Sequence, residues 1–348
     1  MTLLRLPASL FRFLVSRTVL IPAAGLNHVR LPVGYWAYDV SAGEPYIQGQ
    51  AEYVDKAIDW ARAYGLKVML DLHGAPGSQN GYDNSGQRGD ARWPYDTNNV
   101  QRTKAIVEQL SRKYSDPSHY GTVTALAILN EPATYMSDEF ASITKQFNYD
   151  AYGAARYPWR SQGSDGKSGL VITIHDGFQP VNYNDYLTDS QFESVLLDHH
   201  QYTVFSDGEV AMSDQDRLNT ICRKGDEFIQ SKPWIAIGEW SLATTDCARW
   251  LNGRNIGSRY DASYAGSSYV GDCSQKTGDG NNFSDEYKTY LRKFWDVQTQ
   301  TYERREGWIF WTWKTENAVE WSYSAGLAGG WIPWNVQDHV SPLSALCN

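Results

Sequence analysis

Two glutamates stand at the ends of apolar stretches, and this placement points to acid–base chemistry. Glu131 closes the stretch ALAILNEP, and Glu239 lies in IAIGEW. Carboxylates are rarely buried without partners, so a glutamate that ends a buried strand contributes little to packing. Two carboxyl groups that face each other can hydrolyse a glycosidic bond, one as a proton donor and the other as a nucleophile or a base.

The distance between the two carboxyl groups would decide the stereochemistry of such a reaction. A separation of about 5–5.5 Å gives retention through a covalent glycosyl-enzyme, whereas about 6.5–9.5 Å gives inversion. The residues themselves leave both outcomes open. Near a second carboxylate, Glu131 should have a raised pKa and keep its proton, and Arg30 beside Glu239 should lower the pKa of Glu239.

Other apolar stretches also end in polar or aromatic residues. For any one of them, a satisfied polar group at a strand end is the simpler explanation, but recurrence at equivalent positions favours one shared site. Asn130 could bond a sugar 2-hydroxyl, and Tyr202 could hold Glu239 in register. Trp311 could offer a flat face to a pyranose ring. The strand-end residues are Arg30, His73, Asn130, His200, Tyr202, Trp311 and Trp313.

The elements that would position these residues alternate between strand and helix. Apolar strands are expected at 28–33, 67–74, 124–132, 169–176, 194–202, 234–240 and 307–313, and the main helices at 49–65, 99–114, 138–156, 213–230 and 284–302. Strands that are apolar throughout predict a parallel sheet covered on both faces. Because the polar residues gather at the carboxyl ends of the strands, we expect an α/β fold of the (β/α)8 TIM-barrel type rather than an open sheet.

The composition limits the partners of the chain. It has 348 residues and a net charge of −9, which argues against nucleic acid or an anionic membrane and suits a neutral ligand. The apolar N-terminus is interrupted by Arg5, Arg12 and Arg17, so it is neither a clear signal peptide nor a membrane span. No Gly-rich phosphate fingerprint follows a strand, so a dinucleotide cofactor is not expected.

The four cysteines lie in the second half of the chain, at Cys222, Cys247, Cys273 and Cys347. None belongs to a C-x-x-C pair, so neither zinc nor another metal is expected. An even number suits two disulfides and an oxidising compartment, although four buried thiols are an alternative. Cys247 and Cys273 bracket much of a long Gly-, Ser- and Asn-rich stretch over residues 250–284, which we expect at the rim of the site.

The motifs that carry the two glutamates resemble glycoside hydrolase family 5, and in particular its fungal exo-β-1,3-glucanases. The similarity extends from about residue 24 to the C-terminus and includes the stretches GLNHVRLPVGYWAY, DLHGAPGSQNGYDNSG, DHHQYTVFS, GEWSLATTDCARWLNG and FWTWKTENAVEW. The resemblance implies a retaining barrel enzyme without a cofactor. It also implies that Glu131 is the acid/base and Glu239 the nucleophile.

The same resemblance implies a set of substrate-binding residues and two disulfides. Tyr82 and Phe205 would form an aromatic entrance, Asp83 would contact the terminal glucose, Asn252 would add a polar contact, and Trp311 or its neighbour Trp313 would lie beneath the sugar. Arg30, His73, Asn130, His200 and Tyr202 match further binding residues. The implied bridges are Cys222–Cys347 and Cys247–Cys273.

The start of the chain departs from the family. Family members open with a strand that ends in a glutamate and an aromatic residue, and residues 1–23 contain no such strand. Only LLRLP, residues 3–7, could replace it, so the first strand is doubtful or missing. We therefore expect residues 1–23 to be an atypical segment and residues 24–348 to be the catalytic barrel.

The expected activity is the release of glucose from the ends of β-1,3-glucan, with transglycosylation compatible with the same mechanism. A related β-glucanase, such as a β-1,6-glucanase, and a catalytically impaired fragment that only binds glycan are the alternatives. The expected partner is a β-glucan oligosaccharide or polysaccharide. A monomer that is secreted, extracellular or in the cell wall is the expected form of the protein.

Overall fold

The computed structural model describes residues 20–119 and 121–347, which form two compact units. Unit 1 contains the described residues up to Gly177 together with Gln191–Val195. Unit 2 contains Phe178–Ser190 and the residues from Leu196 onward. The strand candidate LLRLP lies outside the described residues. Within the described ranges, no helix has the length and apolar character that crossing a membrane requires.

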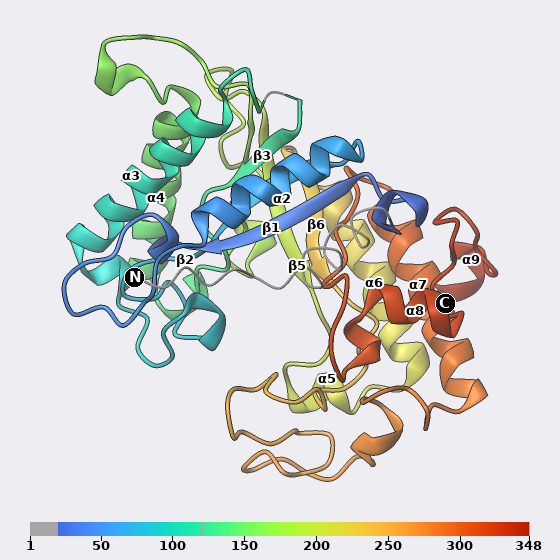
Figure 1. Ribbon diagram of the computed structural model, residues 1–348. Coiled ribbons are helices and arrows are strands. Elements are labelled where there is room, and N and C mark those ends of the chain that lie inside the picture. Colours follow the sequence, from blue (N-terminus) through green and yellow to red (C-terminus); the bar gives the residue numbers. More distant parts are fainter. Residues whose placement is uncertain (1–19, 120, 348) are drawn as a thin grey trace, which may run out of the picture. The chain divides into compact units, whose positions relative to one another are not determined.

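Unit 1 is built on a parallel sheet whose strands follow one another in sequence order (Figure 1). They are β1 His28–Gly34, β2 Lys67–Gly74, β3 Val123–Ala127 and β4 Val171–His175. The connecting helices are α2 Ala51–Ala63, α3 Thr97–Tyr114 and α4 Asp138–Arg156, and α3 lies beside α4. This alternation confirms the α/β class for the strands and helices predicted here.

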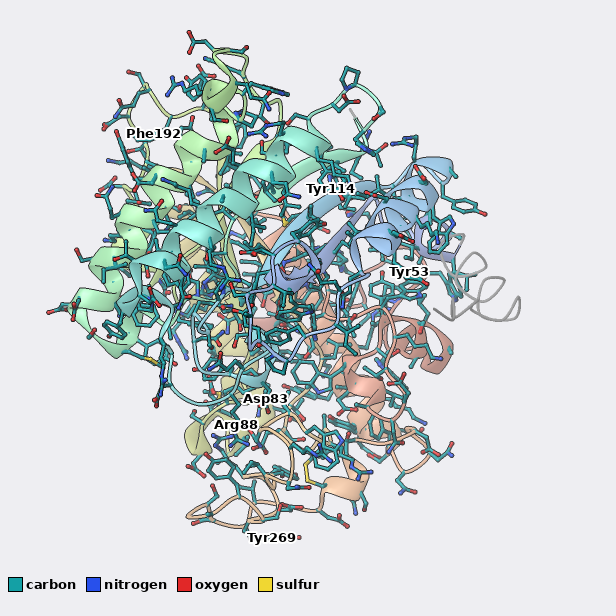
Figure 2. All side chains as sticks on the ribbon, turned by 60° about the vertical axis from the view of Figure 1, so that its left-hand side comes forward. Tyr53, Asp83, Arg88, Tyr114, Phe192 and Tyr269 are labelled. Carbon is teal, nitrogen blue, oxygen red and sulfur yellow. A yellow bond between two sulfur atoms is a disulfide. The ribbon has the colours of Figure 1, made fainter. Side chains whose placement is uncertain are left out.

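Each of the three connecting helices of unit 1 has both buried and exposed residues, and α3 and α4 are capped at their first turn. Tyr114 on α3 is 1% exposed, whereas Tyr53 on α2 is 42% exposed, and both are labelled in Figure 2. The side chain of Asp96 accepts a hydrogen bond from a backbone N–H of the first turn of α3, and Ser137 does the same for α4. These caps satisfy N–H groups that have no partner within the helix.

Strand β3 ends earlier than predicted, at Ala127 rather than at Pro132. The pairing continues irregularly, since the Ile128 N–H donates to the Thr173 carbonyl at 3.1 Å and the Asn130 N–H to the Leu72 carbonyl at 3.0 Å. A regular ladder cannot continue here. Glu131 has a φ of 43°, in the left-handed region, and Pro132 has no N–H to donate.

Unit 2 contains the parallel pair β5 Val195–Gln201 and β6 Trp234–Trp240, although the first residue of β5 belongs to unit 1. Its longer helices are α6 Asp214–Ile229 and α7 Asp285–Tyr302, which lie beside each other. Both begin after a serine that caps the first turn. Unit 2 also contains three short α-helices, α5 Asp207–Val210, α8 Tyr323–Gly329 and α9 Leu343–Leu346.

The strand predicted at 307–313 is wrong as a regular strand. The segment makes one parallel bridge, between Trp308 and Ile237, and its Ile309 and Trp311 N–H groups donate to the Ile237 and Trp240 carbonyls, each at 2.8 Å. The acceptors advance by three residues while the donors advance by two. The register therefore slips, and no continuous ladder forms.

Two disulfides account for all four cysteines, with the pairing that the resemblance implies. Cys222–Cys347 joins α6 to the C-terminal residues, and Cys247–Cys273 closes a loop. The alternative of four buried thiols is therefore wrong. A cross-link stabilises a fold mainly by restricting the unfolded chain, and more so for a longer loop. The sequence separations of 125 and 26 residues thus favour Cys222–Cys347 as the stronger restraint.

A buried carboxyl group in unit 2 makes the stability of the protein depend on pH. Glu320 is 1% exposed, and burial raises the pKa of its carboxyl from 4.5 to about 7. An unfolded glutamate has already lost its proton at pH 5, whereas the folded residue keeps it. Folding is therefore most favourable below the unfolded pKa of 4.5, and this contribution is lost as the pH rises through 7.

We predict that Glu320→Gln, which cannot ionise, removes this loss. The melting temperature of the variant relative to the parent should rise between pH 5 and pH 8, corresponding to a free-energy change on the order of 3 kcal/mol. Thermal unfolding at the two pH values measures the shift. The exposed Glu316 provides the matched control, because Glu316→Gln should change the melting temperature by the same amount at both pH values. A pH-independent difference for Glu320→Gln would contradict the prediction.

Candidate active site

Glu131 lies just beyond the carboxyl end of β3 in unit 1, where the loop that follows β2 holds it. The residue is 7% exposed, and Asn84 Nδ2 donates a hydrogen bond to its Oε2 at 2.8 Å. Asn80 Nδ2 donates to the Glu131 backbone carbonyl at 3.1 Å, and Gln79 Nε2 donates to the Asn130 carbonyl at 2.9 Å. These bonds fix the left-handed backbone of Glu131, which a non-glycine residue adopts only where its surroundings enforce it.

A fully buried aspartate, Asp71, organises the neighbouring polar groups. Arg30 Nη2 lies 3.1 Å from Asp71 Oδ2, and His73 Nδ1 donates to the same oxygen at 2.7 Å. The same Arg30 nitrogen donates to Asn130 Oδ1 at 2.7 Å. Within the described residues, Asn130 Nδ2 has no hydrogen-bond partner although it is buried. Such a donor suits a ligand, in line with the expected contact to a sugar hydroxyl.

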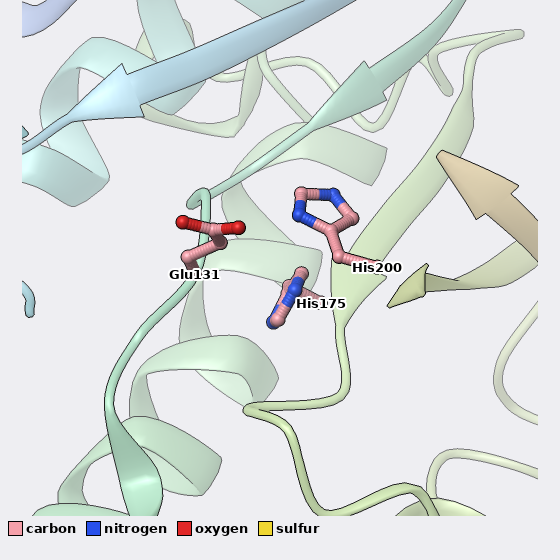
Figure 3. Close-up of side chains that lie close together, drawn as sticks. All are labelled: Glu131, His175 and His200. Atoms are coloured by element: carbon pink, nitrogen blue, oxygen red, sulfur yellow. The ribbon is translucent and has the colours of Figure 1, made fainter. Parts of the chain in front are cut away.

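His175 is the last residue of β4 and was not among the predicted site residues. Its Nδ1 accepts a hydrogen bond from the Gly177 N–H at 2.9 Å, so the neutral ring carries its proton on Nε2. A carboxylate oxygen of Glu131 and a ring nitrogen of His175 lie within 4.8 Å of each other (Figure 3). The signal was present in the sequence, because His175 closes the apolar stretch VITIH.

Tyr82 and Asp83 lie at the exposed rim of unit 1. The Tyr82 and Tyr135 hydroxyls share a hydrogen bond, and the side chains are 42% and 47% exposed. Asp83 begins a short 3-10 turn, Asp83–Ser85, and is exposed. Burial, the bond to Tyr135 and the charge of Glu131 raise the pKa of Tyr82 well above its ordinary value. Tyr135 was not predicted as a site residue, and its sequence neighbourhood gave no signal for the contact.

Glu239 is the buried carboxylate of unit 2. It is 5% exposed, and the Tyr202 hydroxyl donates to its Oε2 at 2.9 Å. His200 Nδ1 lies 3.6 Å from the same oxygen, and His200 Nε2 lies 3.4 Å from Asp198 Oδ2. The register of the two strands places His200 opposite Glu239. The structure thus brings together the predicted residues His200, Tyr202 and Glu239, and adds Asp198.

Gly238 explains why glycine precedes Glu239. A Cβ atom at this position would lie 1.9 Å from Asp198 Oδ1, a distance that no real contact shows. Any side chain would therefore displace Asp198 or separate β5 from β6 next to Glu239. Glycine in the motif IGEW is thus required by packing between strands.

The aromatic residues of unit 2 gather around Tyr202. Trp311 packs with Tyr202 against a buried cluster that contains Trp321, and Phe205 meets the Tyr202 ring edge-on with centroids 5.5 Å apart. Phe205 is 45% exposed, as an entrance residue would be. Trp313 instead stacks on Tyr323, with centroids 5.7 Å apart. This arrangement favours Trp311 over Trp313 as the ring beneath a sugar.

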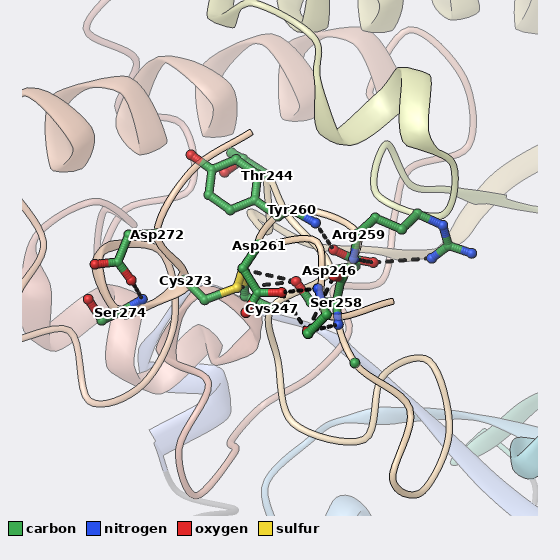
Figure 4. Close-up of a disulfide and its surroundings, with 12 residues drawn as sticks. Thr244, Asp246, Cys247, Ser258, Arg259, Tyr260, Asp261, Asp272, Cys273 and Ser274 are labelled. Atoms are coloured by element: carbon green, nitrogen blue, oxygen red, sulfur yellow. Dashed lines mark hydrogen bonds and ion pairs between the residues drawn. A yellow bond between two sulfur atoms is a disulfide. The ribbon is translucent and has the colours of Figure 1, made fainter. Parts of the chain in front are cut away.

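Asn252 belongs to the hydrogen-bond network of the loop between Cys247 and Cys273. Its Nδ2 donates to Asp246 Oδ2 at 2.8 Å and to the Gly257 carbonyl at 3.0 Å, while its Oδ1 accepts from Arg259 at 2.8 Å. Asp246 is 1% exposed and also accepts from the Arg259 and Tyr260 N–H groups, beside the Cys247–Cys273 bridge (Figure 4). Both amide hydrogens of Asn252 are used by the loop, so its sugar contact stays a prediction.

Each unit therefore contains one of the two glutamates, together with hydrogen-bond partners that hold it. Unit 1 groups Glu131 with the predicted residues Arg30, His73 and Asn130. The expected effect of Arg30 on Glu239, and of Glu239 on Glu131, stays a prediction. A buried carboxylate held by a neutral donor can act as an acid, a base or a nucleophile.

Comparison with known proteins identifies the family. The family described as "Cellulase (glycosyl hydrolase family 5)" matches residues 16–248 of this chain. A glucan 1,3-beta-glucosidase of Blumeria graminis is 44% identical over 327 residues, which cover 92% of this chain and 74% of the relative. A probable glucan 1,3-beta-glucosidase A of Aspergillus niger is 41% identical over 328 residues, which cover 92% of this chain and 74% of the relative.

Solved structures support the same fold class. The rutinosidase from Aspergillus niger has a TM-score of 0.67 at 15% identity and covers 91% of this chain and 82% of its own. Endoglucanase Cel5A from Thermotoga maritima has a TM-score of 0.56 at 18% identity, and the match covers 90% of this chain and 89% of the endoglucanase. Together with the family match, these likenesses confirm an α/β fold of the TIM-barrel class. The chain belongs to glycosyl hydrolase family 5, and its relatives include the fungal glucan 1,3-beta-glucosidases.

Proposed function

We propose that the chain is a retaining glycoside hydrolase that releases glucose from the ends of β-1,3-glucan. The observation that carries this proposal is the pair of buried glutamates, each held through one oxygen by a neutral donor: Asn84 on Glu131 and Tyr202 on Glu239. Such donors orient a carboxyl group without supplying a countercharge. Relatives that are 38–44% identical are glucan 1,3-beta-glucosidases, which supports the glucan specificity.

The mechanism proceeds through two displacements. Glu239 attacks the anomeric carbon while Glu131 gives its proton to the glycosidic oxygen, and the bond between that carbon and oxygen breaks. The glucosyl group is then covalently attached to Glu239. Glu131, now ionised, takes a proton from water as the water oxygen displaces Glu239, which restores the original anomeric configuration. A sugar hydroxyl in place of water would give transglycosylation.

Neighbouring residues support these steps. Tyr202 fixes the carboxylate of Glu239 through its hydrogen bond. The buried Nδ2 of Asn130, which has no hydrogen-bond partner among the described residues, would donate to the sugar 2-hydroxyl, a contact that strengthens in the transition state. Trp311 would pack against the apolar face of the ring. His73, His200, Asp83, Phe205 and Asn252 are proposed as further binding residues.

We also propose that residues 24–348 form the catalytic region and act as a monomer. The reaction needs no cofactor. Two disulfides suit an oxidising compartment, which supports secretion to the extracellular space or the cell wall.

The stereochemistry and linkage of the product test the proposal. The purified chain should release glucose from β-1,3-glucan, and proton NMR of the first products should show the β-anomer. Initial appearance of the α-anomer would exclude retention. Faster hydrolysis of a β-1,6-glucan would indicate the related β-glucanase, and glycan binding without any hydrolysis would indicate an impaired binding protein.

Glu239→Gln is predicted to bind sugar but to lose turnover. The amide keeps the shape of the side chain but is not nucleophilic, so kcat should fall on the order of 10⁴-fold or more. Kinetics on an aryl β-glucoside measure the loss, and the exposed Glu316→Gln variant should retain the parent rate. A 2-fluoroglucoside inactivator should label Glu239 in the parent. Finding the label on another residue would remove Glu239 from this role.

Glu131→Ala is predicted to affect substrates according to their leaving groups. Loss of the acid should slow a glucoside with a poor leaving group by about 10³-fold, whereas an activated leaving group needs little protonation. Added azide should restore the rate with activated substrates and yield β-glucosyl azide. Equal losses for both substrates, without rescue by azide, would argue against Glu131 as the acid/base.

A further inference from the structure

The stretch Asn282-Phe283-Ser284 is a sequon for asparagine-linked glycosylation, and the proposed reaction does not use it. The motif requires Asn, any residue except Pro, and then Ser or Thr, and it occurs once in the 348 residues of the sequence. A single match arises readily by chance. Its use therefore depends on whether Asn282 lies where a bulky oligosaccharide can be attached.

Asn282 lies at the surface of unit 2, in the turn that precedes α7, and its side chain is exposed. The Phe283 N–H donates to the Gly280 carbonyl at 3.1 Å, and the Phe283 side chain is 4% exposed. The Phe283 ring meets the Tyr287 ring edge-on with centroids 4.9 Å apart, and the Trp331 centroid lies 5.8 Å away. The buried phenylalanine thus anchors the turn and leaves the preceding asparagine accessible to solvent.

The amide of Asn282 can carry a sugar and keep its contact with the protein. Its Nδ2 donates to the Ser274 carbonyl at 3.3 Å, and Ser274 follows Cys273 of the Cys247–Cys273 bridge (Figure 4). An amide nitrogen of this kind has two hydrogens. Glycosylation replaces one of them by a sugar carbon, so the second remains available for the bond to Ser274.

Ser284 indicates when the sugar is added. Serine and threonine share a hydroxyl on Cβ, which is therefore the group that the third position of the sequon requires. In the folded protein this hydroxyl accepts a hydrogen bond from the Tyr287 N–H at 3.2 Å and caps the first turn of α7. The hydroxyl is free for recognition only before α7 forms.

We propose that Asn282 is N-glycosylated in the secretory pathway before α7 folds. The amide nitrogen attacks the first sugar carbon of a lipid-pyrophosphate-linked oligosaccharide, and the bond from that carbon to the phosphate oxygen breaks. The lipid pyrophosphate leaves, and a base of the transferase takes the proton that the nitrogen loses. The inference rests on the proposed secretion, which the two disulfides support, and is independent of the hydrolase activity.

Production of the full chain in a yeast, behind a cleavable secretion signal, tests the site. Peptide N-glycosidase should remove one oligosaccharide from the parent and leave an aspartate at position 282, which peptide mass spectrometry locates. Asn282→Gln should lose the oligosaccharide completely, whereas Ser284→Thr should retain it. Secreted and cell-retained chains are both measured, because the sugar is added before folding. An unmodified Asn282 in both fractions of the parent would overturn the proposal.

Asn281→Gln is the matched control, because Asn281 is an exposed neighbour that lies outside the sequon. It should carry the same oligosaccharide as the parent. Ser284→Asp removes the sequon but keeps a side-chain oxygen that can cap α7, so it should lose the oligosaccharide and retain the helix content measured by circular dichroism. An oligosaccharide that persists in Asn282→Gln or Ser284→Asp would refute attachment at Asn282.

Glucan hydrolysis measured on the same preparations separates this inference from the proposed function. A parent that is glycosylated at Asn282 but releases no glucose would refute the hydrolase and support the glycosylation site. A parent that hydrolyses β-1,3-glucan while Asn282 is unmodified would support the hydrolase and refute the site.

Discussion

The buried ion pair between Arg30 and Asp71 is the interaction on which the polar residues at the carboxyl ends of β2 and β3 depend. Asp71 lies between Leu70 and Leu72 on β2 and is fully buried, so its charge must be compensated by partners. Arg30 supplies the charge, and His73 supplies a second hydrogen bond to the same oxygen. Arg30 then extends this arrangement to Asn130, the neighbour of Glu131.

Unit 2 repeats this spacing of aspartate and histidine, with a longer contact of 3.4 Å between Asp198 Oδ2 and His200 Nε2. Asp198 and His200 on β5 are two residues apart, as are Asp71 and His73 on β2, and this spacing places both side chains on one face of a strand. In each case the aspartate lies inside the strand and the histidine nearer its end. On β2 the hydrogen bond to Asp71 thus orients the imidazole of His73 near the carboxyl end of the strand.

Periodic and capped elements were predictable from the sequence, and so were the two glutamates. The helix at 138–156 was predicted with its observed bounds, because its apolar spacing and its serine cap act locally. Glu131 and Glu239 were found because a carboxylate at the end of an apolar stretch is costly wherever the chain folds. The contacts that orient them could not be predicted. Asn84 lies 47 residues from Glu131 in sequence, and Tyr135 meets Tyr82 from a different loop. The slipped register at 307–313 likewise depends on the neighbouring strand, which no local pattern reveals.

The loop between Cys247 and Cys273 has a consequence for protein engineering. Its conformation is fixed from its base, by the disulfide and by Asp246, which receives hydrogen bonds from Asn252, Arg259 and Tyr260. The contacts that fix this conformation therefore lie within residues 246–273. An exchange between relatives should succeed when residues 246–273 are moved as a single cassette. Grafts that divide Asp246 from its donors would separate the loop from the residue that folds it.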